Sequence, residues 1–187
     1  MSVLRASAAV FCHAGDFVGP LDFALQAGEC RTLVFARGRD ASIAARLCAA
    51  IVKPTRGALY VGHFDTRLQP PQAKRLVGFV DVAGLRGSRH AFACEVAFRA
   101  EVWGLDVARA QLRARETLAA IGDDRDPYAR ALALALVPEV KLLVFDQPGH
   151  PRYRARAAEI APETAIVETS VVASRLVVPR DLAAVRS

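Results

Sequence analysis

The chain has 187 residues, of which 53% are hydrophobic and 24% are charged, and its formal net charge is +6. This composition excludes an intrinsically disordered chain, and four cysteines are too few for a disulfide scaffold. The length suits one globular domain, or a domain with a small appended lobe. The positive charge favours acidic partners, but the basic residues are scattered, which is not typical of a nucleic-acid-binding surface.

Targeting and metal-binding signals are absent from the sequence. The longest apolar run, residues 131–138, is far shorter than the roughly 20 residues that a membrane-spanning helix needs. Residues 1–10 are too mixed in character for a signal peptide. The cysteines and histidines show no metal-ligand spacing. We therefore expect a soluble cytoplasmic protein with reduced thiols and no metal centre of its own.

Hydrophobic periodicity predicts strands and helices that alternate along the chain. The expected strands cover residues 3–11, 21–25, 31–36, 58–62, 76–80, 141–146 and 164–169, with 171–178 as an extension or a further strand. The first expected helix is capped by Asp40 or Ser42 and runs to about residue 52. Further helices are expected at residues 91–103, 107–121, 129–137 and 152–160. Between two of the strands, Pro70-Pro71 is expected to break the chain.

The order of these elements predicts the fold class. A strand, a loop, a helix and a later apolar strand that ends in an acid follow one another as in a phosphate-binding α/β domain. A helix N-terminus after a strand offers backbone N–H groups and a positive dipole end to a phosphate. Asp146 ends the apolar strand at residues 141–146, where an acid can hold Mg²⁺. An NTPase-like α/β architecture follows from these features.

Several short segments, in their order and spacing, resemble the ATP-binding subunits of ABC transporters from about residue 21 to residue 178. These segments are Ala27-Gly28-Glu29, Lys53-Pro54-Thr55-Arg56-Gly57, Val77-Gly78-Phe79-Val80, Cys94-Glu95-Val96 with Trp103-Gly104-Leu105, and Leu142-Leu143-Val144-Phe145-Asp146-Gln147-Pro148. The resemblance implies a single domain over residues 1–187 with a P-loop NTPase-like core. It also implies an N-terminal antiparallel β part and a small, reduced helical lobe at about residues 83–128.

The resemblance places the phosphate loop at residues 35–43, where the family pattern requires glycines and a lysine. Two positions match, Gly38 and Ser42, and three depart: Phe35 replaces the first glycine, Asp40 the glycine before the lysine, and Ala41 the lysine. Ala41 cannot reach the β- and γ-phosphates. A carboxylate at residue 40 would repel a phosphate about 4 Å away by roughly 4 kcal/mol at an effective dielectric near 20.

The catalytic positions of the family depart as well. Asp146 matches the metal-holding acid, but Gln147 stands where a glutamate polarises the attacking water. An amide is no base at neutral pH, and a positioned general base contributes typically 10²–10⁴-fold. The Q-loop glutamine corresponds to Val82 and the switch histidine to Ser170. The signature motif is missing from residues 121–130. These departures predict a pseudo-ATPase with no catalytic residues.

The resemblance implies that such a chain acts as a structural or regulatory subunit of a membrane transport complex. Its partners would be a membrane permease, an active ATP-binding subunit, or both, in a homodimer or heterodimer on the inner face of the cell membrane. The permease would dock at about residues 81–105, including Arg86, Arg89, Phe92 and Trp103. The aromatic residues Phe92, Phe98 and Trp103 are equally typical of the core of a helical lobe.

Two alternatives remain open from the sequence. In the first, a partner completes a composite site, and Gly38, Ser42 and Asp146 still hold Mg-ATP weakly. In the second, the chain is a basic binding module unrelated to transport, whose binding would fall steeply with salt. The leading prediction has no cofactor, and no nucleic acid is expected as a partner.

Overall fold

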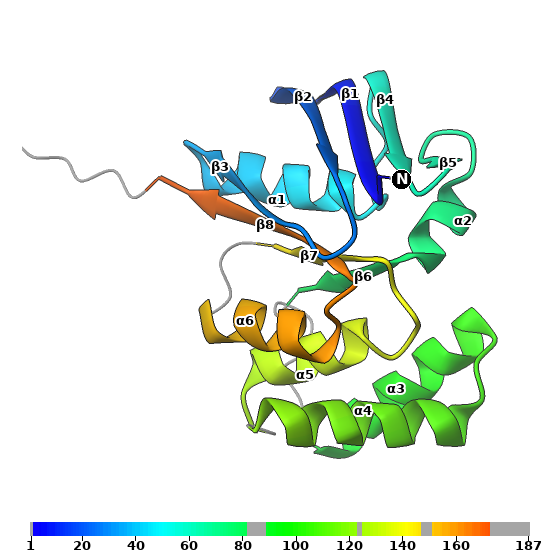
Figure 1. The fold of residues 1–187 in the computed structure, drawn as a ribbon. Helices are drawn as coiled ribbons and strands as arrows, with labels where there is room; N and C mark the ends of the chain where they lie inside the picture. The colour runs from blue at the N-terminus through cyan, green and yellow to red at the C-terminus, as the bar shows by residue number, and fades with distance from the viewer. Residues whose placement is uncertain (1, 82–88, 123–124, 147–150, 173–187) are drawn as a thin grey trace, which may run out of the picture.

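The computed structural model describes residues 2–81, 89–122, 125–146 and 151–172. Within these ranges the strands form two sheets, and helices lie between and below them (Figure 1). The mixed α/β architecture predicted from the sequence is confirmed.

The first sheet is antiparallel and has the strand order β2-β1-β4-β5. Its strands are β1 (Leu4–His13), β2 (Asp16–Leu25), β4 (Arg56–Val61) and β5 (Phe64–Asp65). One face of this sheet contributes buried side chains such as Leu4, Leu25 and Leu59 to the main core. This sheet is the antiparallel N-terminal part that the resemblance implied.

The second sheet is parallel and has the strand order β3-β8-β7-β6. Its strands are β3 (Cys30–Phe35), β8 (Ala165–Val171), β7 (Leu142–Phe145) and β6 (Val77–Val80). All of β7 is buried, as expected for a strand covered on both faces. Because the strands are parallel, their carboxyl ends meet at one edge of the sheet.

Helices cover both faces of the parallel sheet. Helix α1 (Gly38–Cys48) lies between the two sheets, and α5 (Pro127–Ala135) and α6 (Pro151–Ile160) lie on the opposite face (Figure 1). Helices α3 (Arg89–Trp103) and α4 (Val107–Ile121) pack against each other beyond α5. Asp106 caps α4 by accepting a hydrogen bond from the Arg109 N–H, and Gly122 ends it in the left-handed conformation.

Three local expectations were wrong. The Pro70-Pro71 pair does not break the chain but begins α2 (Pro70–Arg75), because the first turn of a helix needs no N–H donors. Neither Asp40 nor Ser42 caps α1, which begins at Gly38 with Arg37 in the cap position. The same helix ends at Cys48 rather than near residue 52, and β5 was not anticipated.

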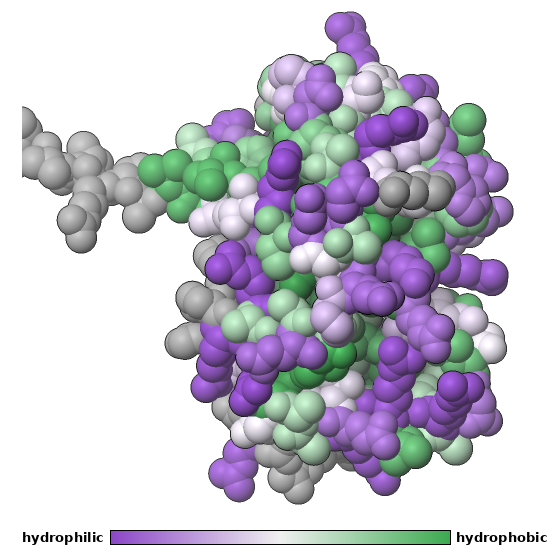
Figure 2. Space-filling model, viewed as in Figure 1, coloured by the Kyte–Doolittle hydropathy of each residue, from purple (hydrophilic) through white to green (hydrophobic). Residues whose placement is uncertain are grey.

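The surface seen in the same orientation is mostly hydrophilic, with hydrophobic residues in separate patches (Figure 2). None of the helices in the described ranges has both the length and the hydropathy of a membrane span.

Candidate functional site

Ser42 and Asp146 meet at the edge where the parallel strands end. Asp146 follows β7, and Ser42 lies in the N-terminal half of α1. The Ser42 hydroxyl donates a hydrogen bond of 2.8 Å to Oδ1 of Asp146. The contact brings together two positions that are far apart in sequence and that the resemblance assigned to the nucleotide site.

The environment of Asp146 favours the neutral acid. Burial is the main cause that raises the pKa of Asp146, and the charge of Asp81 acts in the same direction. The hydrogen bond from Ser42 and the charge of Arg46 lower this pKa, but they do not outweigh burial. Within the described residues, no group of three or more His, Cys, Asp or Glu side chains is arranged to bind a metal ion.

The connection between β3 and α1 is very short. Only Ala36 and Arg37 separate Phe35, the last residue of β3, from Gly38, the first residue of α1. The Ala41 N–H already donates to the Arg37 carbonyl at 3.1 Å, so regular helical hydrogen bonding begins at residue 41. A phosphate cradle needs successive backbone N–H groups that point into a loop. This connection leaves little backbone for one.

A carboxylate occupies the first turn of α1. Asp40 accepts two hydrogen bonds from the Arg37 guanidinium, from Nε at 2.8 Å and from Nη2 at 3.0 Å. The exposed fraction of the side chain is 14% for Asp40 and 66% for Arg37. The contact with Asp40 raises the pKa of Arg37. Asp40 makes no capping hydrogen bond, but it places a negative charge in the first turn of α1, where the helix dipole favours one.

The second arginine of this turn is also paired within the chain. Arg39 Nη2 lies 2.7 Å from Oδ2 of Asp16 at the start of β2. Both arginines near the predicted phosphate loop therefore face carboxylates of the same chain.

The carboxylate of Asp126 caps the N-terminus of α5. Asp126 accepts a hydrogen bond of 2.8 Å from the Tyr128 N–H, one of 3.0 Å from Arg152 Nη2, and one from the Tyr153 hydroxyl. Burial favours the neutral form of Asp126, but these hydrogen bonds outweigh it and lower the pKa of Asp126. Burial of Tyr153 and its bond to Asp126 raise the pKa of that tyrosine to about 12.

The cluster around Asp126 was missed in the sequence. The sequence did contain a signal for the cap of α5, the pair Asp126-Pro127. An acid followed by proline is typical of a helix cap and the first helical residue. The contacts of that acid with Arg152 and Tyr153 come from α6 and had no local signal. They tie the start of α5 to α6, where the rings of Tyr128 and Tyr153 are stacked 5.9 Å apart.

Other predicted site residues are placed as follows. Phe35 is half-buried and packs against the main core, and Ser170 is half-buried near the end of β8. Gln147 and Val82 lie outside the described residues.

Comparison by sequence finds no match, either among protein-family profiles or among curated proteins. Comparison by structure does find similar folds. A nucleotide-free ATP-binding cassette from an ABC transporter has a TM-score of 0.69 and 12% identity, over 91% of this chain and 81% of that one. CbiO1 from Clostridium perfringens, part of the CbiONQ ABC transporter complex, has a TM-score of 0.66 and 18% identity, over 90% and 78%.

A third similar structure is a dimeric ATP-binding cassette in a post-hydrolysis state with ADP and phosphate bound. Its TM-score is 0.65 and its identity 18%, over 90% of this chain and 88% of that one. The chain has the fold of an ABC transporter ATP-binding subunit. In this ABC ATP-binding fold, the phosphate loop that the resemblance places at residues 35–43 falls on the end of β3 and the first half of α1. By the same resemblance, α5 is the helix that follows the signature motif.

The predicted docking residues of the ABC ATP-binding fold fall on or near α3. Phe92 is half-buried and packs against a small core cluster with Val96 and Ala100, and Trp103 is half-buried at the end of the helix. Phe98 is 61% exposed, so the core alternative was wrong for this residue. Arg89 is the first residue of α3, and Arg86 lies outside the described residues.

Proposed function

We propose that this chain is a non-catalytic subunit of a membrane transport complex, with a structural or regulatory role. One observation carries the proposal: the Asp40 carboxylate, held by Arg37, lies in the first turn of α1. In the ABC ATP-binding fold this is the turn to which the resemblance assigns the phosphates. A polyphosphate would have to displace a side chain of the same charge.

The neighbouring position supports the same proposal. Ala41, at the lysine position, is completely buried, with 0% of the residue exposed. It offers no charge to a phosphate. The arginines of this turn do not replace the lysine, because Arg37 is engaged by Asp40 and Arg39 by Asp16.

The start of α5 adds independent support. By the resemblance, the signature motif would precede this helix and face the nucleotide of a partner subunit. Here the N-terminus of α5 is capped by Asp126, whose lowered pKa keeps it negatively charged at neutral pH. A negative cap disfavours a phosphate at this helix end as well. Both halves of an ATP sandwich are therefore disfavoured.

The proposed partners follow from similar proteins. CbiO1 is part of a transporter complex, and another similar cassette is a dimer. We propose that this chain likewise assembles with a membrane permease, an active ATP-binding subunit, or both, on the cytoplasmic face of the membrane. Its contribution would be a folded surface rather than ATP hydrolysis.

Calorimetric titration of the purified chain with Mg-ATP tests the proposal. We expect no saturable heat up to about 1 mM ATP, which corresponds to a binding free energy weaker than about −4 kcal/mol. An ATP-hydrolysing ABC subunit titrated under the same conditions is the positive control. Binding at micromolar ATP would contradict the proposal.

One observation favours a second candidate, a composite site with an active partner. Ser42 and Asp146 remain in contact at 2.8 Å, and these residue types hold Mg²⁺ in NTPases. Under this candidate, nucleotide binding appears only when a competent subunit is added. Asp146→Ala would then abolish nucleotide affinity and leave assembly intact. If Asp146→Ala instead abolished assembly and left nucleotide affinity unchanged, the composite site would be excluded.

A further inference from the structure

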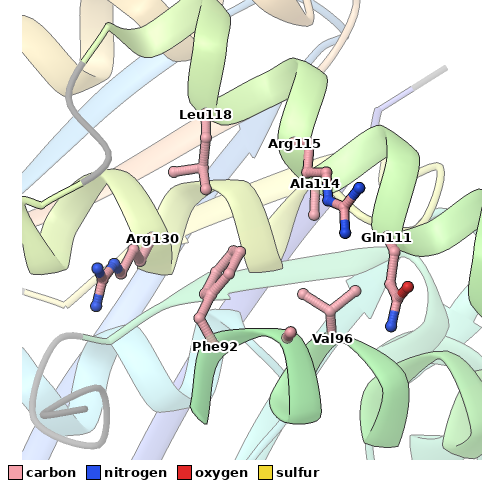
Figure 3. Close-up of a pocket in the computed structure, with 8 residues that line it drawn as sticks. Phe92, Val96, Gln111, Ala114, Arg115, Leu118 and Arg130 are labelled. Carbon is pink, nitrogen blue, oxygen red and sulfur yellow. The ribbon is translucent and has the colours of Figure 1, made fainter. Parts of the chain in front are cut away.

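A cavity of about 340 Å³ opens between α3, α4 and α5, away from the edge that carries Ser42 and Asp146. Phe92, Ala93 and Val96 of α3 line one side, and Ala114 and Leu118 of α4 line the other. Gln111 and Arg115 of α4 and Arg130 of α5 complete the lining (Figure 3). The volume falls at the lower end of the range of small-molecule sites, about 300–1,000 Å³.

The polar and apolar parts of this lining are separated. The ring of Phe92 lies in the middle of the view, with Ala114 and Leu118 of α4 facing it (Figure 3). Arg115 and Gln111 lie to one side of that ring, and Arg130 lies to the other (Figure 3). An elongated ligand could thus place an apolar body on Phe92 and a charged group beside Arg115.

The cavity lining contains cationic side chains. Among the described residues, two arginines line the cavity and no acid does. Arg115 is exposed, and no carboxylate in the described part of the chain forms an ion pair with it. A guanidinium binds a carboxylate with two parallel hydrogen bonds, and a nearby amide such as Gln111 can add another.

We propose that this cavity binds a small organic anion with an apolar body, such as an aromatic or aliphatic monocarboxylate. The carboxylate is held by Arg115 and Gln111, and the apolar body contacts Phe92, Val96 and Leu118. The proposal does not rest on the proposed function, because none of the lining residues is a nucleotide position, although Phe92 also belongs to the predicted docking surface.

The test uses the full chain and naphthoate as the probe, with naphthamide as the neutral comparison of nearly the same shape. Binding is followed by calorimetry and by the NMR shifts of the Val96 and Leu118 methyl groups. We expect saturable binding of naphthoate with a Kd below about 1 mM, in line with the efficiency of ligands of this size. Naphthamide should bind about tenfold more weakly, because it lacks the charge.

Two variants and one control locate the site. Arg115→Gln should weaken naphthoate about tenfold and leave naphthamide unchanged. Arg109→Gln, which removes the same charge from an exposed position on α4 outside this lining, should leave both unchanged. Ala93→Leu fills the cavity and should abolish the binding of both probes, while circular dichroism shows that the fold is kept.

Several outcomes would overturn the proposal. One is the absence of saturation by naphthoate up to about 5 mM. Another is equal affinity for naphthoate and naphthamide, which would mark a plain apolar cavity. A third is an equal loss of affinity in the Arg115 and Arg109 variants, which would indicate a long-range effect of net charge rather than contact with Arg115.

Discussion

The hydroxyl of Ser42 donates a hydrogen bond of 2.8 Å to the carboxylate of Asp146, across 104 positions of the chain. The contact joins α1 to the end of β7 and forms part of the junction between the helix and the parallel sheet. It also counteracts burial, which favours the neutral form of Asp146.

Ser42→Ala should therefore lower the free energy of unfolding by about 1–2 kcal/mol, since it removes a donor from a partly buried acid. Urea denaturation checks this value. Ser42→Thr keeps the hydroxyl and should recover most of the loss. An unchanged midpoint in Ser42→Ala would show that the bond contributes nothing to stability.

Asp146, at the end of β7, and Asp126, at the start of α5, should affect the pH dependence of stability in opposite directions. The native pKa of Asp146 is raised above its ordinary value of 3.8, so its stabilising effect is present below pH 3.8 and is lost as the pH rises through the native pKa. The native pKa of Asp126 is lowered below 3.8, so its stabilising effect is present above pH 3.8 and is lost as the pH falls through the native pKa.

Urea unfolding from about pH 2.5 to pH 6 separates these effects. Asp126→Asn should flatten the loss of stability on the acid side, and Asp146→Asn should flatten a loss that occurs as the pH rises above 3.8. Changes of the same sign in the two variants would contradict the assignment of the pKa shifts.

The thiols should fall into two classes. Cys12, Cys30 and Cys94 are exposed, whereas Cys48 is buried, and burial raises its pKa to about 12. Ellman's reagent at neutral pH should therefore modify three thiols rapidly and the fourth only on unfolding, because the reactive species is the thiolate. In Cys48→Ala the slow class should disappear. Four thiols that react at one rate would contradict the packing of α1.

Gly78 should tolerate no side chain. A Cβ at this position of β6 would lie 2.4 Å from the Ala135 carbonyl oxygen and 2.8 Å from Leu143 Cδ2. Since a backbone carbonyl cannot give way easily, we expect Gly78→Ala to cost about 3 kcal/mol. Gly104→Ala is the control, because its Cβ meets nothing within 4 Å and only its positive φ is strained. That strain costs about 1 kcal/mol. Similar thermal midpoints for the two variants would contradict the close approach of β6 and α5.

The sequence by itself determined most of the strands and helices, though not α2 or β5, and the residue types at the nucleotide positions. Residues 142–145 are apolar without alternation, which predicted the strand that the structure buries on both faces as β7. The period of α4 predicted both of its ends, Val107 and Ile121. The loss of the lysine at residue 41 needs no structure at all. These features are local, because spacing and residue type alone decide them.

Only the tertiary structure decided what the altered residues do. In the sequence, Asp40 is only a replacement for the glycine before the lysine position. In the fold, it is the hydrogen-bond partner of Arg37 and places a negative charge in the first turn of α1. The sequence showed Asp126 before a proline, but not that Arg152 and Tyr153 of α6 would converge on it. The cavity lined by Phe92 and Arg115 forms where side chains of α3, α4 and α5 come together. Such contacts depend on which helices and strands pack against each other. The hydrophobic periodicity of the sequence predicts single elements but not their neighbours.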